Sequence, residues 1–272
     1  MPRSRHHGPG PRRGLAVVMV VSDYGSVIGW AALSVSGLLI GAMLGMSGRF
    51  GHGTIARVTA LGAGLILAAA AVELAAEAVA THPWSGVAAL LGGAATFSAI
   101  NAWLATRGAR DRKRCGECLT KLKTTATVGP ATGAPIAIGT ALDAVPEALV
   151  LGVTLHSRGV ELALIAAIAI GNLPEAMSAS NGMSRAGRSR HWILALWSSV
   201  AVATICLTAA GYAASSLLTD DAVLLLQAFG AGTLLSLVAE TMLPEAAENN
   251  PKFGGLIAAA GFGLLLLISG LG

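Results

Sequence analysis

Carboxylate and amide side chains occur at helical spacing in two apolar stretches of this sequence. Asp143 and Glu147 are four positions apart, and Asn172 and Glu175 are three positions apart. In an α-helix both spacings place the two side chains on one face. If the two faces turn toward each other, their carboxylates repel one another unless a cation lies between them. The pattern therefore predicts an oxygen-rich site for a divalent metal ion.

Proline immediately precedes the glutamate in both stretches, as Pro146 and Pro174. A proline inside a helix removes one backbone hydrogen bond and frees the carbonyl four residues earlier. Freed carbonyls at membrane depth are tolerated where they are buried or line a water-filled cavity, and broken helices with nearby acids form the sites of many transporters. Neither stretch contains Lys or Arg, so a metal ion is the simplest counter-ion. The opposite interpretation is that the acids are protonated or hydrogen-bonded and only hold helices together.

The elements that carry these residues are long and apolar. Of the 272 residues, 54% are hydrophobic and 12% are charged, whereas a soluble domain carries about 25% charged residues. A membrane-spanning helix needs about 20 mostly apolar residues. Segments of that kind are residues 26–46, 57–80, 85–106, 129–155, 160–183, 192–217, 221–243 and 254–271. We therefore expect an all-α polytopic membrane protein with eight transmembrane helices.

The remaining residues form short connections, with two exceptions. Residues 1–24 form a polar N-terminal tail that we expect to be disordered, and residues 25–272 form a transmembrane transporter domain that includes a basic loop at 107–128. Most of the 18 Lys and Arg residues follow the odd-numbered spans. The positive-inside rule then predicts that the 107–128 loop is cytoplasmic and that both termini lie outside the plasma membrane. The net charge of +4 thus reflects topology, and we expect no nucleic-acid partner.

The two Pro-Glu stretches have a recognisable form. Residues 143–148 read Asp-Ala-Val-Pro-Glu-Ala, and residues 171–176 read Gly-Asn-Leu-Pro-Glu-Ala. In these hexapeptides, and in the layout of eight spans with a long loop after the third, the chain resembles the ZIP (zinc/iron permease) family. That family carries His-Asn-x-Pro-Glu-Gly in span four and a related motif in span five. The resemblance implies a ZIP-like bundle that transports a divalent metal ion into the cytoplasm. It also implies that Glu147 and Glu175 are central ligands, with Asn172 as their partner and Asp143 in the place of a histidine.

The cargo stays open among several ions. Zinc is the first expectation from the resemblance, and zinc accepts carboxylate ligands, but an all-oxygen site suits harder ions such as Mn²⁺, and Fe²⁺ is a further alternative. No histidine lies near the centre of a span, and we expect one metal position. We expect no catalytic residue and no resident cofactor; the partners are the metal ion, the lipid bilayer and a second copy in a homodimer.

Two other functions remain open. A ZIP-like protein that has lost transport would use the same residues as a metal sensor or scaffold, and the missing histidines keep this alternative open. An intramembrane enzyme is the less favoured class, because metalloproteases of that kind need His-Glu-x-x-His, which the sequence lacks. We therefore expect that the protein is not an enzyme.

Three further groups of residues have open roles. Cys115 and Cys118, in the 107–128 loop, form either half of a zinc site or part of a basic segment that faces anionic lipid. Acids near the ends of spans two and seven form either a funnel that concentrates cations or water-exposed interfacial groups. These acids are Glu73, Glu77, Glu240, Glu245 and Glu248. Tryptophans near span ends are interpreted as interface anchors, and they are Trp84, Trp103, Trp192 and Trp197.

Overall fold

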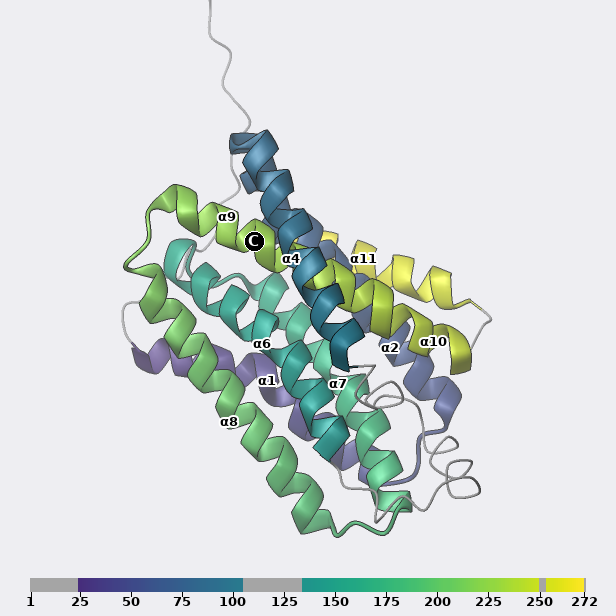
Figure 1. Ribbon diagram of the computed structural model, residues 1–272. Coiled ribbons are helices and arrows are strands. Elements are labelled where there is room, and N and C mark those ends of the chain that lie inside the picture. Colours follow the sequence, from purple (N-terminus) through teal and green to yellow (C-terminus); the bar gives the residue numbers. More distant parts are fainter. Residues whose placement is uncertain (1–23, 105–133, 250–252, 272) are drawn as a thin grey trace, which may run out of the picture.

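Every regular element that the structure describes is a helix (Figure 1). The structure is a computed structural model, and it describes residues 24–104, 134–249 and 253–271. The helices are α1 (Tyr24–Met46), α2 (His52–Ala68), the π-helix η1 (Ala69–Ala75), α3 (Ala76–Thr81), α4 (Pro83–Leu104), α6 (Ala134–Ser157), α7 (Leu162–Arg185), α8 (Arg190–Ser215), α9 (Asp220–Leu237), the π-helix η3 (Val238–Met242), α10 (Leu243–Asn249) and α11 (Gly254–Leu271). The predicted all-α fold class is confirmed.

Six helical stretches are long and apolar enough to cross a membrane. Two of them join several elements: α2, η1 and α3 form one stretch, and α9, η3 and most of α10 form another. The six stretches span Tyr24–Met46, His52–Thr81, Pro83–Leu104, Leu162–Arg185, Arg190–Ser215 and Asp220–Ala247. Each coincides with a predicted span to within a few residues. The other two predicted spans, 129–155 and 254–271, fall on α6 and α11, which are helical but are not among these six. The described residues therefore form a multi-pass helical membrane bundle, and the crossings by α6 and α11 stay a prediction.

Two predictions fall on residues outside the described ranges. One is the disordered tail, of which only residue 24 is described, as the first residue of α1. The other is the 107–128 loop, with Cys115 and Cys118. The structure therefore bears on neither of them.

Helix α1 packs along α7 through glycines at every fourth position. A β-carbon built on any of the three would lie between 1.8 and 2.3 Å from a backbone carbonyl oxygen of α7. The glycines are Gly37, Gly41 and Gly45. Small residues at this spacing let two helix backbones approach closely in a membrane. The row of glycines therefore fixes where α7 lies relative to α1.

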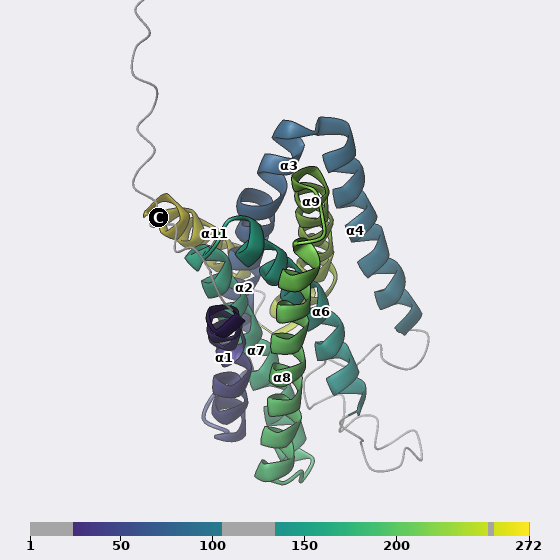
Figure 2. The same ribbon diagram turned by 90° about the vertical axis from the view of Figure 1, so that its left-hand side faces the viewer.

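Three further helix pairs use the same device. A β-carbon on Gly64 of α2 would lie 1.9 Å from a carbonyl oxygen of α11, one on Gly93 of α4 would lie 1.9 Å from a carbonyl oxygen of α9, and one on Gly152 of α6 would lie 2.2 Å from a carbonyl oxygen of α8. Figure 2 shows α4 and α11 at opposite flanks of the bundle. Four outer helices thus each cover one inner helix: α1 covers α7, α4 covers α9, α8 covers α6, and α11 covers α2. The covered helices provide the interior.

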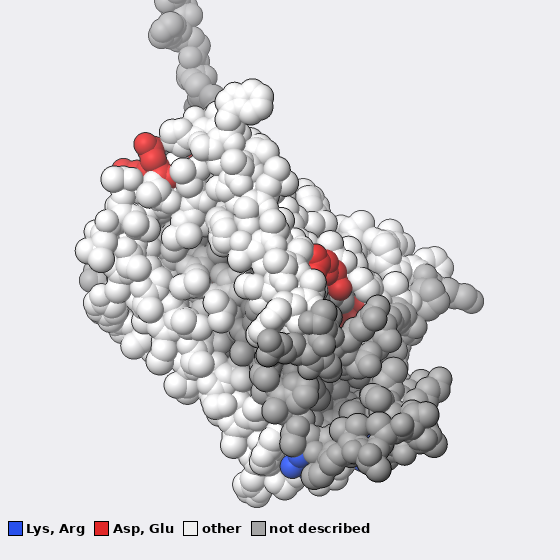
Figure 3. Space-filling model, in the orientation of Figure 1, with Lys and Arg blue, Asp and Glu red and all other residues white. Residues whose placement is uncertain are grey.

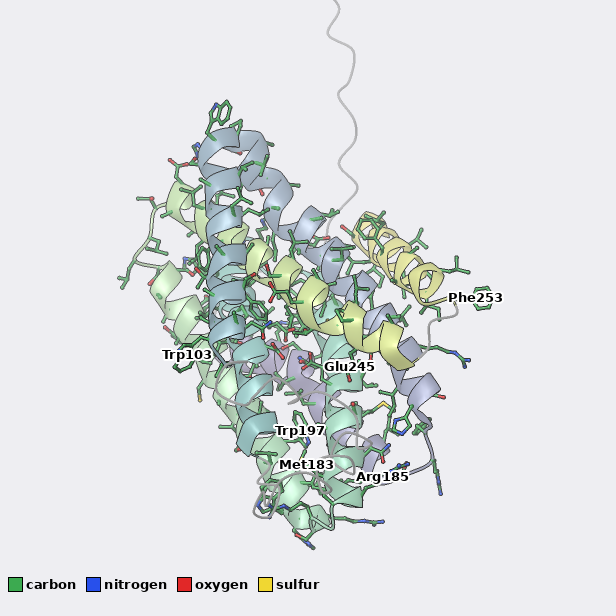
Figure 4. All side chains as sticks on the ribbon, turned by 45° about the vertical axis from the view of Figure 1, so that its right-hand side comes forward. Trp103, Met183, Arg185, Trp197, Glu245 and Phe253 are labelled. Atoms are coloured by element: carbon green, nitrogen blue, oxygen red, sulfur yellow. The ribbon has the colours of Figure 1, made fainter. Side chains whose placement is uncertain are left out.

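One tryptophan of the predicted interface anchors is part of the core instead. Trp197 is 1% exposed, and its Nε1 donates a hydrogen bond of 2.7 Å to Ser180 Oγ on α7. It packs in an apolar cluster with Met183, and both are labelled in Figure 4. The prediction was wrong for Trp197 because a contact with another helix decides its place. Trp84 is 93% exposed, and its role as an interface anchor stays a prediction.

Two of the long helices are widened by a π-helical segment that carries an acid. Glu73 lies in η1, within the second span, and Glu240 lies in η3, at the end of α9. A π-segment shifts the backbone hydrogen bonds to i→i+5 and frequently marks a functional site. Both segments are therefore candidate positions for a functional site, together with the two proline-containing helices.

Candidate functional site

The acids of α6 are buried on one face of the helix. Asp143 is 1% exposed and Glu147 is 3% exposed. Thr154 lies seven residues after Glu147, so it continues the same helical face. Gln227 of α9 donates from Nε2 to Thr154 Oγ1 at 3.3 Å and to Ser157 Oγ at 3.2 Å. The acidic face of α6 therefore lies on the side that α9 covers.

On α7, Asn172 is 3% exposed and Glu175 is half-buried. The glycine row of α1 occupies the side of α7 that carries Leu173. The α2 side is marked by Gly171, where a β-carbon would lie 2.4 Å from Ile66 Cδ1. Asn172 and Glu175 share a further face between these two sides. The close approach of α1 and α2 thus keeps this face inside the bundle.

The hairpin of α6 and α7 brings the two sets of residues to similar depths. The helices are joined by a short turn from Arg158 to Glu161. At 1.5 Å per residue, Glu147 and Asn172 each lie about 15 Å from the turn along their helices, and Asp143 and Glu175 each lie about 20 Å from it. Each acid of α6 therefore lies about as far from the turn, measured along its helix, as one predicted ligand of α7.

Equal distances from the turn do not by themselves make a metal centre. Within the described ranges, no group of three or more His, Cys, Asp or Glu side chains is arranged so that it could hold a metal ion. The structure thus places Asp143, Glu147 and Asn172 in the interior, with Glu175 half-buried, and it does not gather the carboxylates into a closed site. The four-residue ligand set stays a prediction.

A second group of acids lies where the second span meets the α6–α7 turn. Arg158 of the turn donates from Nη1 to the carbonyl oxygen of Glu73, and its Nη2 lies 2.6 Å from Glu77 Oε2. Glu161 precedes the first residue of α7. Burial raises the pKa of Glu161, the negative charge of Glu73 raises it further, and Arg158 opposes both. These four residues are called the turn cluster below.

Sequence reasoning placed Glu73 and Glu77 in this region but missed Arg158 and Glu161. A signal was present, because Arg158 is the single basic residue between the fourth and fifth predicted spans. The positive-inside rule predicts few Lys or Arg residues in a connection on the outer side. A single arginine there is therefore expected to have a specific partner. The structure provides one in Glu77, which lies 81 residues away in the chain.

The acids near the end of the seventh span have a different setting. Ser98 Oγ and Asn101 Nδ2, both on α4, donate to the carboxylate of Glu240, with the Asn101 bond at 2.7 Å. These bonds join α4 to η3, so Glu240 has a structural role whatever its part in a cation funnel. Glu245, in a Leu-Pro-Glu-Ala segment at residues 243–246, lies on α10 (Figure 4). It is on a different helix from the α6 and α7 motifs.

Charged side chains are few on the surface of the described residues. In the face of Figure 3, the described surface is almost wholly uncharged, with acidic patches at the upper left, where α9 begins, and alongside α4. The first helical residues of α9 are Asp220 and Asp221, and His82 Nε2 lies 2.9 Å from Asp221 Oδ1. An uncharged surface of this kind suits contact with lipid.

Comparison with known proteins adds no family. No protein-family model matches the chain, and no curated protein matches it.

Proposed function

We propose that this chain is a divalent metal-ion transporter that carries its cargo into the cytoplasm through Asp143, Glu147, Asn172 and Glu175. The observation that supports this most directly is the burial of Asp143 and Glu147, at 1% and 3% exposure, in an apolar multi-pass bundle. A carboxylate at the bilayer centre costs about 2.5–3.5 kcal/mol on insertion scales. Acids retained at that cost are usually functional.

The residue composition of the two helices favours a cation as the ligand. No Lys or Arg occurs in residues 129–157 or 162–184, whereas three carboxylates occur in the two motifs. A divalent ion held between α6 and α7 would offset the repulsion between them. Asn172 adds an amide oxygen, and Pro146 and Pro174 each leave one carbonyl of their helix without its usual donor. Carboxylate, amide and carbonyl oxygens are acceptable ligands for Zn²⁺, Mn²⁺ and Fe²⁺.

Eight crossings are part of the proposal. Helix α6 has 24 residues and α11 has 18, which correspond to lengths of about 36 Å and about 27 Å. Both are close to or above the roughly 30 Å of a bilayer's hydrocarbon core. With eight spans both termini lie on one side, which the distribution of Lys and Arg predicts to be the outside of the plasma membrane.

The resemblance of the two hexapeptides to the ZIP motifs supports the same function. It favours zinc as the first cargo to test and an alternating exposure of the site to the two sides of the membrane. The sequence contains no nucleotide-binding motif, so the gradient of the metal or of a coupled ion would drive transport.

Uptake of Zn²⁺ into proteoliposomes tests the proposal, with Mn²⁺ and Fe²⁺ as parallel cargoes. We expect Glu147→Ala and Glu175→Ala to reduce uptake to that of empty liposomes while the protein is inserted at normal levels. Asp221→Asn is the matched control, because it alters an acid whose side chain is 73% exposed at a helix end, and it should retain uptake.

The outcomes separate the alternatives. Unchanged uptake in both glutamate variants would remove these residues from the transport site. Metal binding by the wild-type protein without any uptake would indicate the sensor or scaffold instead. A chain that neither binds nor transports any of the three ions would overturn the metal hypothesis.

A further inference from the structure

One side chain of α9 bonds the face of α6 that carries two of the proposed metal ligands. Gln227 is 1% exposed, and its Nε2 donates to Thr154 Oγ1 at 3.3 Å and to Ser157 Oγ at 3.2 Å. A glutamine amide nitrogen carries two hydrogens, so α6 uses both of them. Gln227 thus ties α9 to a part of α6 that lies at least 70 positions away in the chain.

The bonded hydroxyls and the acids belong to one continuous face of α6. Residues 143, 147, 150, 154 and 157 follow one another at intervals of three or four, which keeps them on one side of a helix. Thr154 and Ser157 lie beside the α6–α7 turn, which the distribution of Lys and Arg predicts to lie outside. Glu147 is seven residues from Thr154, which is about 10 Å of helix. A cation that reaches Glu147 from the outside along this face passes the two hydroxyls first.

An apolar contact closes this face between the hydroxyls and the acids. Val150 is 4% exposed, and a β-carbon on Gly230 of α9 would lie 2.0 Å from its Cγ2. The valine therefore occupies the space that a side chain at position 230 would fill, which is called the glycine notch below. Gly230 follows Gln227 by three residues, on the same side of α9. Helix α9 thus covers the face with an amide at the outer end and the glycine notch beneath it.

The hydrogen bonds of Gln227 suit a contact that opens and closes. Its Oε1 is buried and has no hydrogen-bond partner within the described ranges, so the closed state leaves one acceptor without compensation for its lost hydration. Ser157 Oγ also donates to the carbonyl oxygen of Val153 at 3.0 Å, so this hydroxyl keeps a partner when the amide leaves. Separation therefore costs α6 little, and water then satisfies both ends of the amide.

We propose that Gln227 is a positioning residue that closes the outer side of the proposed metal site. Its amide holds Thr154 and Ser157 against α9 and so keeps Val150 in the glycine notch. The closed contact excludes water from the part of the face that leads to Glu147. Metal ions enter from the outside when the two hydrogen bonds break and α9 separates from α6. The role in entry rests on the proposed transport function, whereas the closed contact is tested without metal.

The labelling rate of a single cysteine at position 150 tests the closed contact. Intact cells that express the full-length protein with Val150→Cys are treated with a membrane-impermeant methanethiosulfonate, with no metal added. The three native cysteines are first replaced by serine, and they are Cys115, Cys118 and Cys206. We expect slow labelling with Gln227 in place. Gln227→Met keeps a side chain of similar length without the two donors, and labelling should become roughly tenfold faster as the open form gains population.

Thr233→Val is the matched control for this measurement. Thr233 is also buried on α9, but its hydroxyl donates within its own helix, to the carbonyl oxygen of Gly230. Its substitution removes a buried polar group from the same helix without touching the bonds to α6. The labelling rate should therefore stay at that of the protein with Gln227.

Uptake kinetics distinguish this role from a purely structural one. When the outer side opens more readily, less binding energy is used to open it, so the apparent KM for Zn²⁺ should fall roughly threefold in Gln227→Met. The kcat per folded molecule should fall as well, because the return to the closed form is less favourable. A variant that only lost folded protein would keep the KM of the wild type.

Three results would decide against the proposal or for it. Equal labelling rates with Gln227 and with Gln227→Met would overturn it, and so would an equal acceleration by Thr233→Val. If Gln227→Met fails to fold, Ser157→Ala decides instead, because it removes one of the two acceptors and should accelerate labelling by a smaller factor. If the wild type transports none of the three ions, the transport hypothesis fails, while the labelling rates still support or overturn the closed contact.

Discussion

The acids of the turn cluster and the acids of α6 and α7 differ in the positive charges that lie near them. In the turn cluster, Glu77 and the backbone of Glu73 are held by Arg158, a cation that belongs to the chain. In the α6–α7 hairpin, no Lys or Arg occurs in either motif. The first group lies at the end of the bundle, and the second lies about 15–20 Å along the helices from the turn. One group thus has a cation of the chain among its partners, whereas the segments of the other contain no Lys or Arg.

The backbone is opened differently in the two groups as well. Pro146 and Pro174 each remove one donor from an otherwise continuous α-helix, so single carbonyls are freed at defined positions. In η1 the whole segment Ala69–Ala75 shifts to π-helical bonding, and Arg158 caps one of its carbonyls. A proline can be seen in a sequence, whereas a π-segment is a product of packing.

The largest effect is expected from a change in the glycine row of α1, which positions α7 and its acids. Gly41→Leu should prevent α1 from packing on α7, because a β-carbon at Gly41 would lie 2.2 Å from the carbonyl oxygen of Leu173. Overpacking of this kind costs about 1–3 kcal/mol or more. We expect a more than tenfold loss of folded protein, or of metal uptake per folded molecule, measured by gel filtration and in proteoliposomes.

Gly29→Leu is the matched control for that glycine row. It lies on the same helix, and nothing approaches within 4 Å of a β-carbon there, so yield and uptake should stay near those of the wild type. If Gly41→Leu were as well tolerated as the control, the α1–α7 seam would not set the position of the hairpin acids.

An intermediate effect is expected at the turn cluster. Arg158→Gln should lower the free energy of unfolding by about 1–3 kcal/mol, because the carbonyl of Glu73 loses its charged donor in a half-buried place. Glu77→Gln should cost less than about 1 kcal/mol, since that carboxylate is 58% exposed and surface ion pairs contribute little. Thermal unfolding in detergent measures both, and equal costs would show that the ion pair, rather than the backbone contact, is the stabilising interaction.

The smallest effect is a pH dependence of stability. The pKa of Glu161 is raised in the folded protein above its ordinary value of 4.5. Between these two values the folded state binds more protons than the unfolded state, so this residue's contribution to stability is present below 4.5 and is lost as the pH rises through the folded pKa. The slope stays below the one-proton limit of about 1.4 kcal/mol per pH unit, because the side chain is only half-buried.

Glu161→Gln should flatten this part of the profile relative to the wild type. Unfolding temperatures recorded at a series of pH values in the same detergent give the comparison. A variant profile that keeps the wild-type slope would assign the pH dependence to another group.

Much of the fold could be predicted because membrane helices are specified locally. Uncharged segments of about 20 residues can satisfy their backbone in lipid only by forming helices. For that reason the six helices long and apolar enough to span lie within a few residues of the predicted segments. The interior positions of Asp143 and Glu147 follow from the same logic, since a lipid-facing carboxylate is costly.

Tertiary contacts account for what the sequence could not predict. Trp197 lies near the end of a predicted span, yet its indole bonds Ser180 on a neighbouring helix. Glu240 resembled a member of a funnel, yet its partners Ser98 and Asn101 precede it by 142 and 139 residues. No local pattern encodes such pairings, because they depend on how closely the helices approach.

The sequence by itself determined that this chain forms apolar helices, which of them carry acids beside proline, and that those acids have no basic residue in their own segments. Only the tertiary structure decided which distant residues meet: Arg158 reaches Glu77, and α4 reaches Glu240. The physical reason is that hydrophobicity and proline act within a few residues. A hydrogen bond between distant helices instead depends on how closely the packed helices approach one another.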